Sequence, residues 1–322
     1  MGGSSAPLAV MLDAASFDRN DIDYTRLYST THQWQRYEQT RPKELPTRLA
    51  DAEIIVTNKV PIGKNDLESA PSLKLICVAA TGTNYFDIEA ARALGVTVCN
   101  VKNYATESVT QHVVSLMLAL ARHLCDYSTA VNNGRWSHAQ QFCMLDFPIE
   151  ELNGKTLGII GYGVLGQSVA KIASTFGMKV LIAERRGAQP RPHRVDFFEV
   201  LEQSDVISLH CPLTADTKNL ISTAELIQMK NTAWIINTAR GELIDEIALA
   251  NALDNGQIGA AALDVLSIEP PPEDHPLLTS PRKNLLITPH IAWASRTARQ
   301  RLIDEVASNI QAYLSGQAQN IV

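Results

Sequence analysis

One glycine-rich segment limits the folds open to this chain more than any other feature. Gly161, Gly163 and Gly166 have the spacing G-x-G-x-x-G, between an apolar run at 156–160 and a helical pattern at 164–176. In that context the first glycine permits a tight turn, the second lets the backbone approach a pyrophosphate, and the third allows close helix–strand packing. The segment therefore predicts a parallel α/β unit that binds a dinucleotide at a helix N-terminus.

The end of the next predicted strand, at 179–183, indicates which dinucleotide. Glu184 follows that strand, and a carboxylate there can accept hydrogen bonds from the adenosine ribose and repel a 2′-phosphate, which favours NAD. Arg185 and Arg186 come next, and guanidinium groups suit a 2′-phosphate, so NADP stays open. A solvated turn with no cofactor role is the remaining alternative.

Apolar runs and helical patterns alternate through most of the chain, which predicts parallel sheets covered by helices. Gly95 stands where a glycine that ends a helix belongs, and the polar loop 132–152 is longer than most connections. The predicted strands are 8–12, 54–56, 75–78, 96–98, 156–160, 179–183, 206–209, 233–237, 259–263 and 285–287, and the predicted helices are 88–94, 109–124 as one apolar stripe, 164–176, and a last helix with Leu302, Ile303, Val306, Ile310, Tyr313 and Leu314 on one side.

Composition excludes several classes of protein. A net charge of −6 without a dense basic run argues against nucleic-acid binding. The most apolar helix, 113–121, is too short to cross a bilayer, so no membrane partner is expected. The 5 cysteines form no C-x-x-C pair, which favours free thiols in a reducing, cytoplasmic compartment and no metal site. Residues 1–5 look like a flexible end and lack the pattern of a signal peptide.

Three later segments contain residues suited to catalysis. Arg240 follows a predicted buried strand, where open parallel sheets bind ligands, and its guanidinium offers paired donors to a carboxylate. His290 follows another strand and could give a proton to a developing alkoxide. Glu269 could bond the second ring nitrogen of that histidine and favour its charged form. Taken singly, an arginine or histidine is more often a surface or structural residue, so spacing alone leaves the triad open.

Several motifs in order resemble those of the D-isomer-specific 2-hydroxyacid dehydrogenases: 80–84, the glycine segment, 210–214, 237–241, 264–270 and 288–290. The resemblance implies that Arg240, Glu269 and His290 are catalytic. It implies that the amides of Thr81 and Gly82, with Arg240, bind the substrate carboxylate. The predicted cofactor-binding residues are Gly161, Tyr162, Gly163, Val164, Leu165, Gly166, Glu184, Arg185, Cys211, Thr238, Ala239, Arg240, Asp264 and His290.

The resemblance also implies an architecture. The expected fold class is α/β, with two Rossmann-like, doubly wound parallel-sheet domains. An NAD-binding domain at 104–291 would be inserted into a discontinuous, flavodoxin-like substrate domain made of 6–103 and 292–322. A homodimer is expected, with the helix near 108–125 and the loop after it at the interface.

Within the family, 57–61, 79–84, 134–136 with 142–143, and 289–293 most resemble the glycerate dehydrogenases, or hydroxypyruvate reductases. This implies NADH- or NADPH-dependent reduction of hydroxypyruvate or glyoxylate to a D-2-hydroxy acid such as D-glycerate, and the reverse. The Glu-Arg pair at 184–185 departs from the aspartate common in the family, which leaves cofactor choice open.

Two other functions stay open. One is a dinucleotide-sensing, corepressor-like binding protein on the same fold, against which the sequence offers only the lack of an obvious partner-binding extension. The other is a D-3-phosphoglycerate dehydrogenase. Long forms of that enzyme add a C-terminal regulatory domain, for which a chain ending at Val322 leaves no room, although short forms weaken the point.

Overall fold

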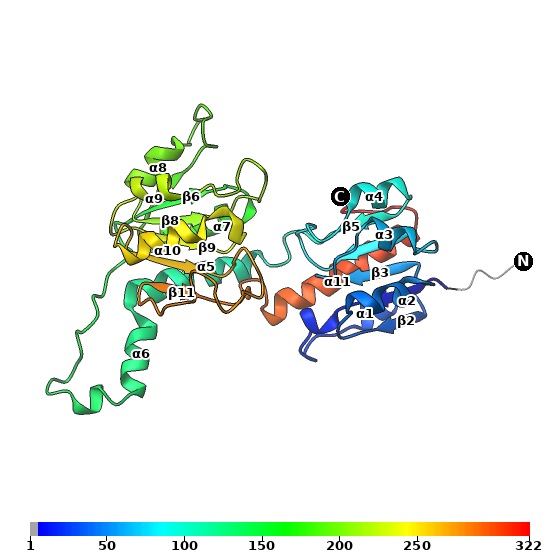
Figure 1. Cartoon of the computed structure of the whole chain (residues 1–322), viewed down its shortest axis with the longest axis horizontal. Coiled ribbons are helices and arrows are strands. Elements are labelled where there is room, and N and C mark those ends of the chain that lie inside the picture. The colour runs from blue at the N-terminus through cyan, green and yellow to red at the C-terminus, as the bar shows by residue number, and fades with distance from the viewer. Residues whose placement is uncertain (1–5) are drawn as a thin grey trace, which may run out of the picture. The chain divides into compact units, whose positions relative to one another are not determined.

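The computed structural model describes residues 6–322, which form two compact units, each with its own parallel sheet (Figure 1). The first unit contains the described residues up to Ala105 together with Trp293–Val322, and the second is Thr106–Ala292. The predicted domain boundaries, at 103/104 and 291/292, lie beside these divisions, and the roles assigned to the two domains stay predictions. The segment 1–5, expected to be a flexible end, lies outside the described residues.

The sheet of the first unit has the strand order β2-β1-β3-β4-β5, and every pair is parallel. This is the order of the flavodoxin-like doubly wound fold. Strands β3 and β4 are buried along their whole length, as strands covered on both faces must be. The strands are β1 (Leu8–Met11), β2 (Gln33–Arg36), β3 (Ile54–Thr57), β4 (Leu75–Val78) and β5 (Thr97–Cys99).

Helices cover both faces of this first sheet. The long C-terminal helix α11 packs on the face that α1 also covers, and α2, α3 and α4 pack on the other. Because α11 returns from the far end of the chain, the unit is discontinuous. The predicted apolar side of α11 is confirmed from Leu302 to Ile310, but Leu314 is exposed. The helices are α1 (Thr25–Tyr28), α2 (Leu45–Leu49), α3 (Lys64–Glu68), α4 (Ile88–Ala93) and α11 (Arg296–Leu314), with short 3-10 turns η1 (Ala14–Ser16) and η2 (Pro42–Glu44).

The sheet of the second unit has the order β11-β10-β9-β8-β6-β7, again with all pairs parallel. Beyond β7, a single parallel bridge joins Ala183 to Val195. Val195 thus takes the place of the third strand in the 3-2-1-4-5-6 order of dinucleotide-binding folds. The strands are β6 (Thr156–Ile160), β7 (Lys179–Ile182), β8 (Val206–Leu209), β9 (Trp234–Asn237), β10 (Ala260–Leu263) and β11 (Leu285–Ile287).

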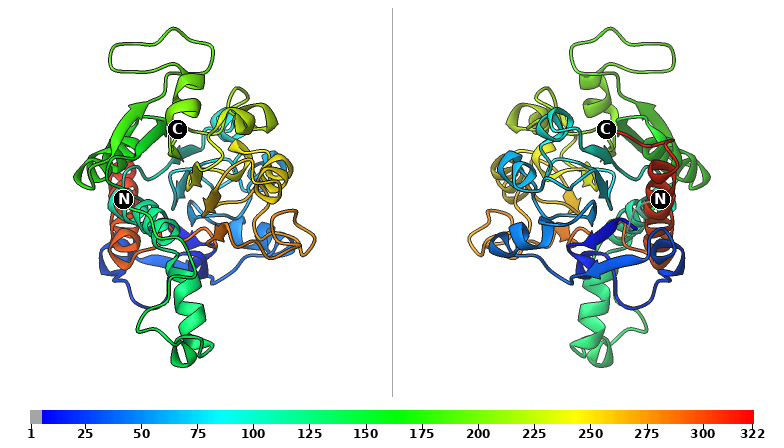
Figure 2. Two further views of the ribbon diagram at one scale, coloured as in Figure 1. Left: turned by 90° about the vertical axis from the view of Figure 1, so that its left-hand side faces the viewer. Right: turned by 90° about the vertical axis from the view of Figure 1, so that its right-hand side faces the viewer.

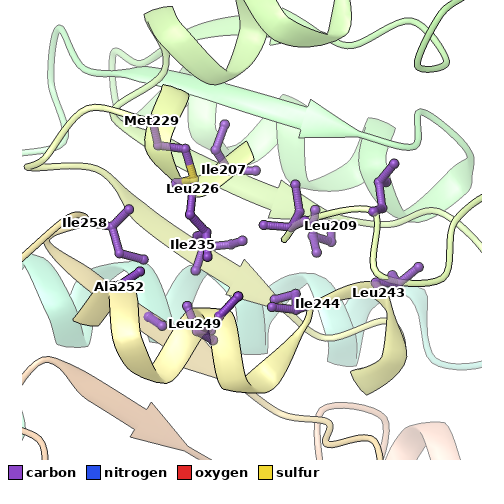
Figure 3. Packing of buried hydrophobic residues seen from close by; sticks show 14 of the residues in the cluster. Ile207, Leu209, Leu226, Met229, Ile235, Leu243, Ile244, Leu249, Ala252 and Ile258 are labelled. Atoms are coloured by element: carbon purple, nitrogen blue, oxygen red, sulfur yellow. The ribbon is translucent and has the colours of Figure 1, made fainter. Parts of the chain in front are cut away.

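The second sheet is also covered on both faces. On one side α8, α9 and α10 close an apolar core against β8 and β9, where Leu226, Ile235 and Leu249 meet (Figure 3). Helices α5 and α7 cover the opposite side. The helices are α5 (Thr106–Arg122), α6 (Leu124–Asn132), α7 (Val164–Thr175), α8 (Phe197–Gln203), α9 (Thr223–Gln228) and α10 (Glu246–Asp254), with 3-10 turns η3 (Trp136–His138) and η4 (Gly241–Leu243).

The structure corrects one predicted helix. The apolar stripe from 109 to 124 was expected to form a single helix, but α5 ends at Arg122 and α6 begins at Leu124. His123 between them has φ +45, a left-handed conformation that turns the chain. Leu124 therefore leaves the apolar stripe and is 63% exposed. Among residues 6–322 no helix is long and apolar enough to cross a membrane.

Candidate active site

The glycine segment forms the turn from β6 into α7. Gly161 has φ +96, and a Cβ there would collide with the amide of Cys211, while a Cβ on Gly166 would collide with the carbonyl oxygen of Gly161. Protein packing thus requires glycine at both positions. At Gly163 a Cβ would meet nothing within 4 Å, and the backbone is exposed. The chain itself gives no steric reason for glycine at 163, whereas a group approaching that backbone does.

The first turn of α7 provides donors at this open position. Gly163 is the N-cap in extended conformation, and the amides of the first helical turn have no intrahelical acceptors. The side chains of Tyr162 and Leu165 are half-buried, and Val164 is exposed beside the turn. This arrangement can bind an anionic group with backbone N–H donors and the positive end of the helix dipole.

Glu184 lies at the end of β7, as predicted, but its carboxylate is fully engaged. Oε2 accepts hydrogen bonds from the Nε of Arg191 at 2.6 Å and from the amide of Arg191 at 3.2 Å. Oε1 accepts from Nη2 of Arg191 at 2.6 Å and from the amide of Arg185 at 2.9 Å. The Arg191 guanidinium holds the pKa of the Glu184 carboxyl far below its usual range. The predicted ribose acceptor is therefore present but already paired.

Arg240 follows β9 directly, at the carboxyl edge of the sheet. The side chain of Asn237 fixes the turn, since its Nδ2 donates to the carbonyl of Arg240 at 2.7 Å and its Oδ1 accepts from the amide of Ala239 at 3.0 Å. Nη1 of Arg240 donates to the carbonyl of Ala239 at 2.6 Å. Thr238 Oγ1 is buried without a hydrogen-bond partner among residues 6–322. A buried hydroxyl in that state is a group for which a ligand can supply the missing partner.

His290 and Glu269 come together as predicted. Nδ1 of His290 lies 2.6 Å from Oε2 of Glu269, and Oε1 of Glu269 accepts a 3.0 Å hydrogen bond from the amide of Leu266. Both side chains are 28% exposed, so they are held in place without being sealed from ligands. Because His290 follows β11 and the loop with Glu269 follows β10, the pair lies at the same edge of the sheet as Arg240.

Asp264, predicted to contact the cofactor, holds the backbone around His290. One carboxylate oxygen accepts from Thr288 Oγ1 at 2.5 Å and from the amide of Ile291 at 3.0 Å, and the other accepts from the amide of Ala292 at 2.8 Å. The carbonyl of Asp264 accepts from the amide of His290 at 2.8 Å. These contacts stabilise the left-handed backbone of His290, whose φ is +53. Asp264 is a positioning residue in this structure.

Sequence reasoning missed a second set of contacts that holds the Glu269 loop. Glu246, at the start of α10, accepts hydrogen bonds from the amide of Ser267 at 2.8 Å and from the hydroxyl of the same residue. Its Oε2 also lies 3.1 Å from Nε2 of the buried His275, whose Nδ1 accepts from the amide of Leu277 at 3.3 Å. A first-turn glutamate is ordinary in sequence, so only the fold reveals this cluster.

Cys211 lies against the glycine turn, and its contact with a cofactor stays a prediction. Its thiol packs into the core of the unit, and burial raises the pKa of the thiol to about 11. The adjacent His210 bonds Ser208 Oγ through Nε2 at 2.9 Å, and burial lowers the pKa of its imidazole to about 4. Both side chains are therefore neutral near pH 7 and serve as part of the wall behind Gly161.

The predicted substrate loop lies in the first unit, after β4. Oγ1 of Thr81 donates to the carbonyl of Val101 at 2.7 Å, and Nδ2 of Asn100 donates to the carbonyl of Thr81 at 2.7 Å. These bonds hold the loop without using the amides of Thr81 and Gly82. Their role as donors to a substrate carboxylate stays a prediction. Among residues 6–322 no cluster of three or more His, Cys, Asp and Glu has the geometry of a metal site.

Comparison with known proteins identifies the family. The family model "D-isomer specific 2-hydroxyacid dehydrogenase, NAD binding domain" matches residues 114–292. The chain belongs to the D-isomer-specific 2-hydroxyacid dehydrogenase family. It is 48% identical to glycerate dehydrogenase of Methylorubrum extorquens, over 95% of this chain and 97% of that one. It is 38% identical to hydroxypyruvate reductase of Blautia hydrogenotrophica, over 97% and 98% of the two chains.

A solved structure in this family shows the same fold. The D-lactate dehydrogenase of Aquifex aeolicus, solved with NAD and lactic acid, superposes with a TM-score of 0.83 at 27% identity, over 96% of both chains. The predicted fold class, the enzyme class and the dinucleotide cofactor are thereby confirmed for the dehydrogenase. The open backbone at Gly163 and the orphan hydroxyl of Thr238 fit a bound dinucleotide.

Proposed function

We propose that this dehydrogenase reduces hydroxypyruvate to the D-2-hydroxy acid D-glycerate and glyoxylate to the achiral glycolate, and that it catalyses the reverse reactions. The similarity to a glycerate dehydrogenase and a hydroxypyruvate reductase over nearly the whole chain supports the substrate class. The single observation that carries the chemistry is the 2.6 Å contact between His290 Nδ1 and Glu269 Oε2. When bound at the glycine turn, a reduced nicotinamide dinucleotide would supply the hydride.

His290 is the proposed proton donor. With Nδ1 donating to Glu269, the ring keeps Nε2 as the nitrogen that gives its proton to the substrate oxygen. The proton on Nε2 of His290 would go to the oxygen of the substrate carbonyl, which gains negative charge as C2 is reduced, and would complete the hydroxyl group. The imidazolium becomes neutral, and the Glu269 carboxylate keeps the ring orientation for reprotonation from water.

Arg240 is the proposed anchor of the substrate carboxylate. Its guanidinium can form two parallel hydrogen bonds with a carboxylate, which orients a small keto acid that offers few other contacts. The backbone amides of Thr81 and Gly82 are the proposed additional donors. Glyoxylate and hydroxypyruvate share the 2-keto carboxylate and differ only in the substituent on C2, so the same donors serve both.

The working form of the enzyme is a proposed homodimer in a reducing, cytoplasmic compartment. Helix α6 and the loop after it extend away from the sheet of their unit (Figure 2). They expose large apolar side chains, including Phe142 at 89% and Leu145 at 80%, which a second copy could cover. The 5 cysteines are all free thiols, which agrees with a reducing environment. Light scattering of the purified chain measures the oligomeric state directly.

Initial rates test the proposed reaction. We expect hydroxypyruvate and glyoxylate to be reduced with higher kcat/KM than pyruvate or 3-phosphohydroxypyruvate, and the glycerate formed to be the D-isomer by chiral chromatography. A preference for 3-phosphohydroxypyruvate would make the protein a D-3-phosphoglycerate dehydrogenase. Tight dinucleotide binding without turnover of any of these acids would favour a nucleotide-sensing binding protein instead.

A further inference from the structure

The loop between β7 and α8 is basic, although Glu184 at its start is the carboxylate that was expected to repel a 2′-phosphate. Residues 184–194 contain 4 arginines and a single acid, Glu184. The loop extends from the periphery of the second unit (Figure 2). It follows the strand whose end receives the adenosine ribose in dinucleotide-binding folds. The charge around that ribose therefore depends on how these side chains pair with one another.

Glu184 cannot act on the ribose as a lone carboxylate. A carboxylate has about four acceptor positions. Arg185 and Arg191 fill them with two backbone amides and a bidentate guanidinium, at distances from 2.6 to 3.2 Å. The Glu184 side chain is only 2% exposed, whereas that of Arg191 is 57% exposed. The solvent-exposed member of the pair is thus the arginine.

The other charges of the loop add to this effect. Nε of Arg194 lies 3.9 Å from Oε2 of Glu184, so a second guanidinium faces the same carboxylate. Arg185 is exposed, and no ion pair of its side chain is found in the described part of the chain. Arg186 is committed elsewhere, with Nη2 at 2.9 Å from Oε1 of the buried Glu225. The net field near Glu184 is positive, which suits an anion rather than a neutral ribose hydroxyl.

We propose that Arg191, by pairing with Glu184, removes the repulsion that would exclude a 2′-phosphate, and that the enzyme therefore binds NADPH at least as tightly as NADH. Arg191 is the specificity-determining residue in this assignment. It neutralises the carboxylate and presents the remaining surface of its guanidinium, together with Arg185, to the phosphate. This inference rests on the proposed function only for the identity of the dinucleotide site.

Binding measurements test the assignment without catalysis. The dissociation constants of NADH, NADPH and the half-cofactors 5′-AMP and 2′,5′-ADP are measured by calorimetry. For the unaltered protein we expect NADPH and 2′,5′-ADP to bind as tightly as, or more tightly than, NADH and 5′-AMP. Arg191→Ala removes the bidentate guanidinium from Glu184 and leaves the two backbone amides and Arg194 in place. Two acceptor positions of the carboxylate then become available to the ribose hydroxyls, and its negative charge can repel a phosphate. The ratio of the NADPH constant to the NADH constant should then rise by about tenfold to a hundredfold.

A matched control separates this effect from a change in overall charge. Arg282 makes a bidentate pair with Asp254 in the same unit, at 2.6 and 2.8 Å, on a different loop. Arg282→Ala removes the same charge and the same kind of ion pair, and should leave the ratio unchanged. Glu184→Gln is the second variant. It abolishes the carboxylate charge and should keep or tighten NADPH binding.

Failure of the Arg191 assignment can be told apart from failure of the proposed function. A protein that binds NADH more tightly than NADPH, or an Arg191→Ala variant with an unchanged ratio, would overturn the assignment while leaving the proposed reaction intact. Equal effects of Arg191→Ala and Arg282→Ala would also overturn it, because overall charge would then be the cause. Failure of both dinucleotides to bind the unaltered protein would instead refute the proposed function.

Discussion

Glu246 Oε1 accepts a 2.8 Å hydrogen bond from the amide of Ser267, two positions before Glu269 in the chain. This bond ties the loop with the proposed catalytic carboxylate to the first turn of α10. Gly241, the residue after Arg240, allows the backbone of this loop to lie against the Arg240 turn. A Cβ on Gly241 would collide with the backbone of Leu266 and Ser267. The Arg240 turn and the Glu269 loop are thus fixed against each other by backbone packing and a buried glutamate.

Glu246→Ala should lower kcat about tenfold to a hundredfold, because a displacement of about 1 Å at the Glu269–His290 pair is enough for a loss of that size. The free energy of unfolding should fall by about 1–3 kcal/mol, since donors of Ser267 and His275 lose their acceptor. Glu246→Gln keeps one acceptor and should restore part of kcat. Steady-state kinetics well below the melting temperature and a calorimetric Kd for the dinucleotide provide the readouts.

A control for Glu246 is Glu225→Gln. Glu225 is a buried first-turn glutamate of α9 that accepts from the amide and hydroxyl of Ser222 and pairs with Arg186, whereas Glu246 bonds the Glu269 loop. The Glu225→Gln variant should lower the free energy of unfolding and leave kcat within about threefold of the unaltered enzyme. If Glu246→Ala changed stability alone, Glu246 would have no part in positioning Glu269.

Two glycines of the turn from β6 into α7 should respond differently to replacement by alanine. Gly166→Ala forces a Cβ into the carbonyl of Gly161 and should destabilise the fold by about 1–3 kcal/mol or more. Gly163→Ala meets open space at φ −83 and should change stability by about 1 kcal/mol at most, the usual effect of such a change at an N-cap. Its added methyl group should instead weaken dinucleotide binding at least about tenfold.

Thermal unfolding and calorimetric titration of these two variants separate the roles. Equal loss of stability for both would mean that Gly163 is required by packing. Unchanged dinucleotide binding in Gly163→Ala would show that the ligand does not approach that backbone.

His210 should make the fold less stable in acid. Its imidazole has a pKa of about 4 in the folded chain against the ordinary 6.5, because burial disfavours the charged ring. Between these values the unfolded chain binds more protons than the folded one, so the free energy of unfolding falls as pH drops from about 6.5 to 4. The loss is about 3 kcal/mol at most, and less because the residue as a whole is only partly buried.

His210→Gln removes this titration. Urea unfolding at several pH values should show the unaltered protein losing, relative to the variant, up to about 3 kcal/mol between pH 7 and pH 4. A stability difference that stayed constant over that interval would mean that His210 titrates alike in the folded and unfolded chains.

Much of the fold follows from local patterns in the sequence. Buried parallel strands are continuous apolar runs, and the strand predicted at 206–209 coincides with β8. Strand β2 was missed because Gln33–Arg36 is an edge strand of polar residues around one half-buried tryptophan, Trp34. The break at His123 is not evident in the sequence, because the turn uses positive φ at a residue other than glycine.

The parts of the site that lie in recurrent sequence motifs could be predicted from the sequence. The glycine turn and the His290–Glu269 pair are of that kind. Glu184 was found at its expected place, but its pairing with Arg191 depends on how the loop folds back over the strand end, which no local pattern encodes. The contacts of Glu246 with Ser267 and His275 join segments far apart in sequence, so they became visible only in the structure.

The most direct test of the proposed mechanism is the turnover of His290→Ala with hydroxypyruvate, measured together with its dinucleotide dissociation constant. Loss of the general acid should lower kcat by about 10²- to 10⁴-fold. The dissociation constant should change far less than kcat, because the glycine turn from β6 into α7 is untouched and His290 is only one of the predicted cofactor contacts. Glu269→Gln should lower kcat less than His290→Ala, since it removes the orienting charge and keeps the proton donor. A His290→Ala variant that turns over hydroxypyruvate within a few-fold of the unaltered enzyme would contradict the assignment of His290 as the proton donor.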